Sequence, residues 1–422
     1  MRIWVFASGE PLPSANRKVR LLRAGNLCNY LQQAGHQVQW WTSSFDHIRR
    51  QQLAPSELQS PANGLVYRAV PSPGYRSNLG PARLWDHALL AWRFWRLALQ
   101  PQPRPDVIWC CYPPIETAFA AVALGRHLRV PVVLDVRDLW PDVFLDALPG
   151  PARGLGALAL WPYFLVSRLA LRRATALVGV TEPYLDWALA RAGRVRHALD
   201  RCFPMGYPDF RLSPQDADAA RAYWQAQGVS AESFNVCFFG TLGRQFDIDT
   251  VIRAAALLQQ GGSSVRLILC GHGDALEELR GQAAGLPNLL FPGHVHTPEI
   301  KALMDISAIG LAPYRNTENF RRNLPNKIFE YAAGGLPVLS AVDGEVGRFL
   351  RQHAIGSLYP AGDAAALARQ LTQLAGERES LRAQGQRARA LFCESFEAGR
   401  VSAGILAHLQ ELTDATRGKD GP

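Results

Sequence analysis

No stretch of this 422-residue sequence reaches the ~20 consecutive apolar residues that a helix needs to cross a bilayer. The nearest candidate, residues 154–173, is interrupted by Pro162 and Arg168. The first apolar run, IWVFA, is too short for the core of a secretory signal, and we interpret it as a buried strand. We therefore expect a cytoplasmic protein that is soluble or bound to a membrane only at its surface.

Paired cysteine spacings are also missing. The seven cysteines are scattered, and most lie within apolar runs, which excludes a disulfide framework and a cysteine-based zinc site and predicts reduced, buried thiols. No acidic Asp-x-Asp pair follows a predicted strand, where it could hold Mg²⁺; the triplet at residues 247–249 opens a predicted helix and fits a capping role. We therefore expect no metal site and no bound cofactor.

Negative charge is scarce in the first half of the chain. Residues 1–205 hold 24 Lys and Arg against 13 Asp and Glu, so this half accounts for the whole net charge of +9. The excess either keeps the surface soluble or attracts an anionic partner, such as a membrane, an acidic acceptor or nucleic acid. Residues 87–100 and 154–173 combine apolar side chains with arginines. Each segment either lies in a bilayer interface or packs in a core with its arginines reaching outward.

Both halves of the chain alternate short apolar segments with segments of helical period. Continuous apolar strands separated by helices predict parallel sheets covered on both faces. We therefore predict an α/β protein of two Rossmann-like domains, residues 1–205 and 206–395. A helix at 396–412 should pack back toward the first domain, and residues 413–422 should form a disordered tail. The predicted strands are residues 2–8, 37–43, 106–112, 131–137 and 176–181, then 235–243, 265–273, 288–295, 308–314 and 336–342.

Three loops of the second half follow predicted strands, where open parallel sheets bind ligands. In the first loop, Gly240 and Gly243 would let backbone N–H groups approach a phosphate, with which Arg244 could pair. A tight turn with a solvated arginine is equally consistent with this loop. The next two loops could present backbone groups to a ligand, although a lone histidine there is also common as a plain surface residue. Their candidate residues are Gly271, Gly293, His294 and Val295.

The segment LPNKIFEYAAGGLPVLS, residues 324–340, is the most informative. Pro325 suits the first turn of a helix. Lys327 and Glu330 are three positions apart, so they share one face of that helix. The pair could hold a diphosphate and sugar hydroxyls, or it could be a simple ion pair on the surface.

These segments occur in the order found in the retaining glycosyltransferases of family 4. PNKIFEYAAGGLPVLS, preceded by FFGTLGRQFDIDTVIRAA, LCGHGDALEELR and DISAIGLAPY, resembles their donor-binding half. GEPLPSANRKVRLLRAGNL, GHQVQWWTSSFDH and DVRDLWPDVF are similar to the N-terminal domain of members that transfer amino sugars in surface-polysaccharide assembly. The resemblance covers nearly the whole chain and implies the GT-B fold, two facing Rossmann-like domains with a cleft between them.

The resemblance also implies roles for single residues on the donor side. Glu330 matches the carboxylate that binds the donor ribose, while Lys327 and Arg244 match the cations that neutralise the donor diphosphate. Gly293, His294 and Val295 occupy the base-binding loop. Asn326 and the glycines of the first two loops complete the implied site.

On the acceptor side, Arg137 and Asp138 stand where many members carry His-Asp. Asp138 is thus the implied acceptor-orienting residue, and Arg137 replaces the usual histidine. A second departure concerns the family's two glutamates, which lie eight positions apart. Arg322 stands where the first would be, and Glu318 could substitute only if the loop were rearranged.

The implied activity is transfer of a sugar of the N-acetylated hexosamine type from a nucleotide-sugar such as a UDP-sugar. The implied acceptor is a polyprenyl-diphosphate-linked or other glycan of surface-polysaccharide or lipopolysaccharide synthesis. The enzyme would bind it at the inner face of the plasma membrane, and the transfer would need no metal ion. A nucleotide-sugar epimerase of the same fold is the alternative. The basic half also raises nucleic-acid binding, but the sequence carries no recognisable reader motif, so we expect no such partner.

Overall fold

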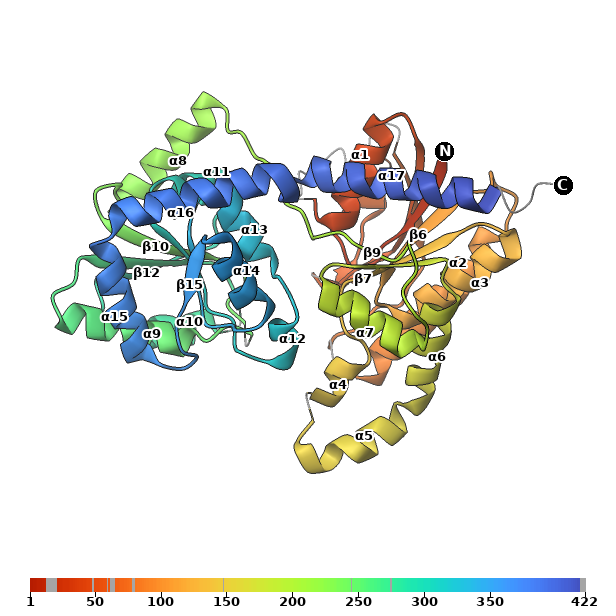
Figure 1. Cartoon of the computed structure of the whole chain (residues 1–422), viewed down its shortest axis with the longest axis horizontal. Coiled ribbons are helices and arrows are strands. Elements are labelled where there is room, and N and C mark those ends of the chain that lie inside the picture. The colour runs from red at the N-terminus through yellow and green to blue at the C-terminus, as the bar shows by residue number, and fades with distance from the viewer. Residues whose placement is uncertain are drawn as a thin grey trace. The chain divides into compact units, whose positions relative to one another are not determined.

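The computed structural model describes residues 1–12, 21–47, 49–58, 60, 65–77, 80–146, 148–243, 245–273 and 275–417. The chain divides into two compact units (Figure 1). Unit 1 comprises Met1–Gly206 and Ala398–Pro422, and unit 2 comprises Tyr207–Glu397. The division after Gly206 lies one residue from the boundary that the sequence predicted.

Unit 1 is built on a sheet in which every pair of neighbouring strands is parallel. Among the described residues it has seven strands, in the order β5-β2-β1-β6-β7-β8-β9. The central strands are continuous apolar runs, as a sheet covered on both faces requires. The strands are β1 (Arg2–Phe6), β2 (Gln37–Ser43), β5 (Val66–Val70), β6 (Val107–Tyr112), β7 (Val132–Val136), β8 (Ala176–Gly179) and β9 (Arg201–Cys202), beside a small antiparallel pair, β3 (Phe45–Asp46) and β4 (Gln51–Gln52).

Helices cover both faces of this sheet. On one face α1 packs against α17, and on the other α2, α3, α6 and α7 pack side by side (Figure 1). The short helices α4 and α5 lead into α6. The bounds are α1 (Arg23–Gln33), α2 (Pro81–Ala98), α3 (Ile115–Leu128), α4 (Asp142–Asp146), α5 (Arg153–Ala159), α6 (Trp161–Arg173), α7 (Glu182–Ala192) and α17 (Ala398–Arg417), with 3₁₀ turns at Pro55–Leu58 and Gly150–Ala152.

The last helix, α17, belongs to unit 1. Its apolar residues Val401, Ile405, Leu409 and Leu412 recur at helical spacing and join the core formed with β1, β6 and α1. The predicted disordered tail is wrong at its start, because α17 continues through Arg417. Thr413 is buried, and its hydroxyl donates to the carbonyl of Gln410, 2.8 Å away.

Unit 2 contains a second sheet of the same kind. Its six strands within the described residues are all parallel and follow the order β12-β11-β10-β13-β14-β15. The central strand β10 is buried throughout. The strands are β10 (Phe234–Phe239), β11 (Val265–Cys270), β12 (Leu289–Gly293), β13 (Ile309–Ala312), β14 (Val338–Ser340) and β15 (Gly356–Leu358).

The helices of unit 2 also form two layers. Helix α9 packs with α10 and α15, while α8 packs with α11 and α13 packs with α16. The bounds are α8 (Pro214–Ala226), α9 (Ile248–Gln260), α10 (Leu276–Gln282), α11 (Thr297–Asp305), α12 (Glu318–Arg321), α13 (Asn326–Ala333), α14 (Glu345–His353), α15 (Ala364–Ala375) and α16 (Arg378–Leu391), followed by a π-helical turn at Phe392–Phe396.

The seven cysteines, all among the described residues, are free thiols. Five are buried, and burial raises the pKa of Cys28, Cys110 and Cys237. The prediction of buried thiols fails for Cys202, which is half-buried, and for Cys393, which is exposed in the turn after α16.

Candidate functional site

The carboxyl edge of the unit 2 sheet places a buried charge pair beside the central strand. Helix α13 begins at Asn326, one residue after Pro325, which is extended rather than part of the first turn. Lys327 is only 7% exposed and Glu330 4%, and the Lys327 Nζ lies 3.7 Å from Glu330 Oε2. Burial excludes the simple surface ion pair that the spacing also allowed. A buried charge pair is costly to desolvate, so it is more often functional than a surface pair.

The ammonium group of Lys327 is held at the end of β10. It donates to the carbonyl oxygen of Phe239 and lies 4.9 Å and 4.7 Å from the ring centroids of Phe238 and Phe239. A Cβ on the next residue, Gly240, would stand 2.9 Å from the Lys327 Nζ. Glycine at this position therefore leaves room for a positive charge at the carboxyl end of the central strand.

The loops after β10, β11 and β12 are joined to one another by backbone hydrogen bonds. The amide of Gly240 donates to the carbonyl of Cys270 at 3.0 Å, and that of Gly271 donates to Gly293 at 2.7 Å. Gly271 has φ +152°, and a Cβ there would lie 1.8 Å from the Gly240 carbonyl oxygen, so only glycine fits. The Gly240 amide, predicted to approach a phosphate, and the Gly271 amide, predicted to face a ligand, both donate to carbonyl groups in this structure.

The predicted phosphate loop has two further members, Gly243 and Arg244, and the structure describes only the first. The amide of Gly243 donates to the carbonyl of Thr241 at 2.9 Å. Arg244, the predicted second cation, lies outside the described residues. Of the two cations predicted to bind the diphosphate, Lys327 is thus the one that the described residues place at this edge of the sheet.

The loop after β12 gathers three imidazole rings. His294 is exposed, whereas its neighbours Gly293 and Val295 are buried. Its ring centroid lies 5.2 Å from that of His272 and 5.0 Å from that of His296. Partial burial and the two neighbouring histidines lower the pKa of His294, which favours the neutral ring at physiological pH.

The position of the family's first glutamate is taken by an arginine that binds Glu318. The Nε of Arg322 donates to Glu318 Oε1 at 2.8 Å, and both side chains are exposed. The carboxylate of Glu318, the substitute considered from the sequence, is thus engaged by Arg322 itself. Glu330 is the carboxylate that α13 places next to the lysine.

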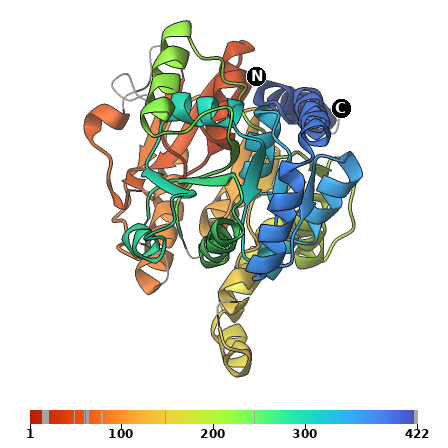
Figure 2. The ribbon, with the colours of Figure 1, turned by 90° about the vertical axis from the view of Figure 1, so that its left-hand side faces the viewer.

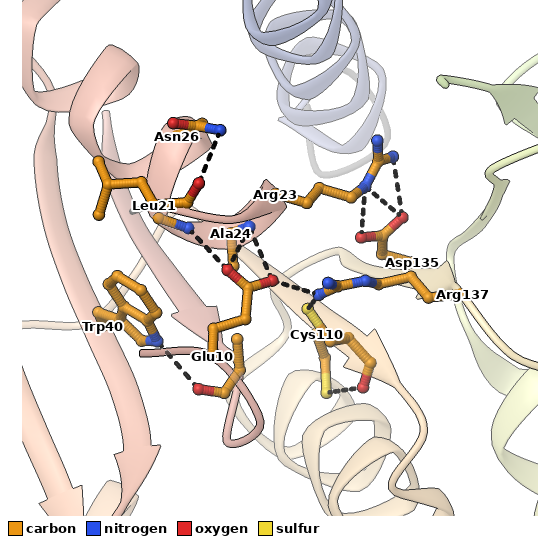
Figure 3. A network of polar contacts seen from close by, with 12 residues as sticks. Glu10, Leu21, Arg23, Ala24, Asn26, Trp40, Cys110, Asp135 and Arg137 are labelled. Atoms are coloured by element: carbon orange, nitrogen blue, oxygen red, sulfur yellow. Dashed lines mark hydrogen bonds and ion pairs between the residues drawn. The ribbon is translucent and has the colours of Figure 1, made fainter. Parts of the chain in front are cut away.

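In unit 1, Arg137 lies in a buried polar network at the end of β7 (Figure 3). Its guanidinium Nη1 contacts Glu10 Oε1 at 2.6 Å and donates to the Cys111 sulfur at 3.2 Å. Burial opposes its charge, but the Glu10 carboxylate and Cys111 raise the pKa of Arg137 above its ordinary value. A guanidinium so held is a fixed positive charge that cannot replace a histidine in proton transfer.

Sequence reasoning missed Glu10, which also closes the start of α1. Its carboxylate accepts hydrogen bonds from the backbone amides of Ala24, at 2.9 and 3.0 Å, and Gly25, at 3.1 Å. Amides of a first helical turn have no partner within the helix, and the helix dipole favours an anion there. A second buried pair, Arg23 Nε to Asp135 Oδ2 at 2.9 Å, lies beside it (Figure 3). No local motif marks either pair.

Asp138, the predicted acceptor-side carboxylate, follows Arg137 at the same edge. Its Oδ1 accepts a hydrogen bond from the amide of Leu139 at 2.8 Å. Burial raises the pKa of Asp138 above its ordinary value. Arg137 and Asp138 are adjacent in sequence, but only Arg137 contacts Glu10 in this network.

A cavity of about 150 Å³ lies at the carboxyl edge of the unit 1 sheet. Residues that follow β1, β2, β6 and β7 line it together with the start of α2. His47 Nδ1 and the Tyr75 hydroxyl are 2.5 Å apart, and the Arg83 guanidinium lies 4.5 Å from the ring centroid of Trp140. Aromatic faces beside hydroxyl, imidazole and guanidinium groups suit a polar ligand with flat apolar surfaces. No local sequence pattern indicates this cavity, because its lining comes from many separate segments.

A buried carboxyl group lies behind this cavity. Glu116 accepts a hydrogen bond from the Tyr163 hydroxyl at 2.9 Å, and its other oxygen is 3.8 Å from Nδ1 of His87, which lines the cavity. Burial raises the pKa of Glu116 to about 7 and lowers the pKa of His87 to about 3. Both groups are therefore largely uncharged in mildly acidic solution.

These shifts predict a pH-dependent stability that Glu116→Gln removes. The pKa of Glu116 rises from 4.5 to about 7 on folding, so its contribution to stability is fully present below pH 4.5 and is lost as pH rises through 7. We expect the variant to gain roughly 3 kcal/mol relative to the wild type across that window. Urea unfolding between pH 4.5 and 8 checks this. Parallel curves for the two proteins would contradict it, since the contribution of His87 is common to both.

Comparisons with known proteins agree with this arrangement. Residues 22–200 match a family described as "Glycosyl transferase 4-like domain", and residues 233–377 match "Glycosyl transferases group 1", so the two matches span most of the chain. A phosphatidyl-myo-inositol mannosyltransferase of Mycobacterium leprae (strain TN) is 38% identical over 111 residues. This match covers 26% of the chain and only 28% of the relative.

Solved structures resemble the chain over almost its whole length. Sucrose-phosphate synthase from Thermosynechococcus elongatus has a TM-score of 0.71 at 17% identity, covering 98% of this chain and 99% of that one. HepE of Anabaena, in complex with UDP and glucose, has a TM-score of 0.66 at 16% identity, covering 97% and 100%. At such low identity these likenesses show the fold alone, and they confirm the prediction of a GT-B fold.

Proposed function

The chain belongs to glycosyltransferase family 4, and from that premise we propose that it transfers a sugar from a nucleotide-sugar bound in unit 2 to an acceptor bound in unit 1. The observation that carries the proposal is the buried pair of Lys327 and Glu330 at the carboxyl edge of the unit 2 sheet. Open parallel sheets bind nucleotides at this edge. The Anabaena neighbour was solved with UDP, which supports a UDP-sugar as the donor.

In this proposal Lys327 stabilises the leaving group. Breaking the bond between a sugar and a diphosphate develops negative charge on the phosphate oxygens, and a fixed cation lowers the barrier by meeting that charge. Lys327 would move from the Phe239 carbonyl to the diphosphate, joined by Arg244, so that no metal ion is needed. Glu330 would accept hydrogen bonds from the donor ribose, with Asn326 and the loops of Gly240, Gly271 and His294 beside it.

The transfer would proceed with retention of configuration. A phosphate oxygen of the leaving group would take the proton of the acceptor hydroxyl, so that the fixed charge of Arg137 at the usual histidine position is tolerated. Asp138 would orient that hydroxyl. We propose a polyprenyl-diphosphate-linked glycan of surface-polysaccharide synthesis as the acceptor and an N-acetylated hexosamine as the sugar. The lipid substrate named in the mycobacterial relative supports a lipid-linked acceptor.

A thermal-shift screen tests the donor half of the proposal. A ligand at 100 times its Kd stabilises the native state by about 2.7 kcal/mol, so UDP and one UDP-sugar should raise the Tm of unit 2 by several degrees. GDP and ADP are the matched controls and should shift it less. A screen in which no nucleotide or nucleotide-sugar changes the Tm would contradict a donor site at Lys327 and Glu330.

An incubation with a nucleotide-sugar distinguishes a transferase from an epimerase. Incubated alone with the protein, UDP-N-acetylhexosamine should be recovered as the same sugar isomer. A transferase releases UDP from it only when an acceptor extract is added. An epimer formed without any acceptor would overturn the transferase proposal in favour of the epimerase.

A further inference from the structure

Helix α5 and the start of α6 form an arm that projects from the body of unit 1 (Figure 1, Figure 2), while the rest of α6 packs against α3 and α7. No single helix among the described residues is long and apolar enough to cross a membrane, but Gly150–Ala159 and Trp161–Arg173 together reach that apolar composition across a 65° bend. Four large apolar side chains of the arm face solvent: Leu155 and Leu158 are each 74% exposed, Trp161 62% and Leu165 43%. Single exposed apolar residues are ordinary, whereas a group of this size needs a partner.

The four side chains form two pairs, one on each side of the bend. Leu155 and Leu158 are three positions apart on α5, and Trp161 and Leu165 are four apart on α6, so each pair shares one helix face. The break between the helices lies at Leu160. The two pairs thus lie on either side of the bend, and we call these four exposed residues the apolar tip.

Basic side chains lie behind the apolar tip. Residues 150–173 contain four arginines and no acidic residue. Arg168 and Arg172 are exposed and continue the face of Trp161, seven and eleven positions further along α6. At a rise of 1.5 Å per residue they stand about 10 and 16 Å behind the tryptophan along the helix.

This order of groups matches the depth profile of a membrane interface. Interfacial helices bury their apolar face about 5–10 Å below the headgroup region and keep basic residues at the level of anionic phosphates. Tryptophan prefers the boundary between the two zones. A second copy of the chain is a poorer occupant, because residues 150–173 hold no acidic residue that could pair with the arginines of another arm.

We infer that the apolar tip inserts into the interface of an anionic bilayer, with Arg168 and Arg172 at the lipid phosphates. The inference deepens the proposed function by naming the surface on which a lipid-linked acceptor would be met, and it rests on that function only for this purpose. It assigns the membrane contact to α5 and α6. The sequence also suggested residues 87–100, on α2, as a membrane-binding segment. Under this inference that segment does not contact lipid.

Vesicle co-sedimentation of the full chain tests the inference. We expect binding to vesicles of equal parts phosphatidylcholine and phosphatidylglycerol and much weaker binding to phosphatidylcholine alone. Leu155→Ser with Leu158→Ser should weaken binding on the order of 100-fold, since both side chains then lose apolar burial in the bilayer. Arg168→Gln with Arg172→Gln should reduce the preference for the anionic vesicles instead. All four positions are exposed, so folding should persist.

Trp92→Ser on α2 is the matched control. Trp92 is 52% exposed and stacks with Arg96, its guanidinium 4.9 Å from the ring centroid, so it presents a similar apolar and basic surface. Its variant should bind vesicles like the wild type. Loss of binding in Trp92→Ser with full binding in the double leucine variant would overturn the inference. The inference would also be overturned if the wild type did not bind vesicles but formed dimers, and the double leucine variant stayed monomeric.

The outcome is separable from that of the proposed function. The double leucine variant should keep the full thermal shift with the nucleotide-sugar, because its changes lie in unit 1 and the donor site lies in unit 2. Vesicle binding without any nucleotide response would sustain this inference and contradict the proposed function. A nucleotide response without vesicle binding would support the proposed function and contradict this inference.

Discussion

Lys327→Ala should lower the turnover number for sugar transfer by roughly 100- to 1,000-fold, the usual loss when one group that stabilises developing negative charge is removed. The ammonium is buried at the end of β10, held by the Phe239 carbonyl and by Glu330 at 3.7 Å. A charge in that setting acts with little screening by water. The measurement is release of UDP from the nucleotide-sugar identified by thermal shift, with and without an acceptor extract.

Lys301→Ala is the matched control for this experiment. Lys301 lies in the same unit on α11 and makes an exposed i,i+4 pair with Asp305, so its loss should leave turnover unchanged. Glu330→Gln adds a second readout, since loss of the proposed ribose contact should raise KM more than it lowers kcat. If Lys327→Ala folds, by circular dichroism and melting, and still turns over normally, Lys327 does not serve the leaving group.

The sequence predicted the sheets well because their central strands are buried on both faces. The prediction for β2 agrees with the observed strand Gln37–Ser43, and β6, β7 and β11 lie within their predicted ranges, while β10 begins one residue before its predicted range. The edge strands β5 and β15 were missed. β5 alternates exposed and buried residues, and β15 has only three residues, so neither shows the continuous apolar run of a central strand.

The candidate site was predictable only in part. The spacing of Lys327 and Glu330 shows a shared helix face, but whether that face is buried depends on the strand end against which α13 packs. The bond between Glu10 and Arg137 joins residues 127 positions apart, so no local pattern could reveal it. The cavity beside Trp140 is likewise assembled from loops that are distant in sequence.

Glu10→Gln should destabilise unit 1 by about 3 kcal/mol, because it leaves the largely buried guanidinium of Arg137 without its carboxylate. The amide oxygen can still accept from Ala24 and Gly25 at the start of α1, so the change isolates the charge. For a unit of this size the Tm should fall on the order of 10 °C. Calorimetry, which separates the melting of the two units, is the measurement.

A double-mutant cycle tests whether the lost stability comes from the ion pair between Glu10 and Arg137. Arg137→Met added to Glu10→Gln removes the stranded charge, so the double variant should recover much of the lost stability. Glu411→Gln provides the surface comparison, because its partner Arg201 is exposed at 38% and the pair should be worth less than about 1 kcal/mol. If Glu10→Gln costs no more than Glu411→Gln, the network in Figure 3 does not fix the loop after β1. Since that loop borders the cavity beside Trp140 through Ser8 and Gly9, a confirmed loss of stability would show that the ion pair stabilises part of the lining of that cavity.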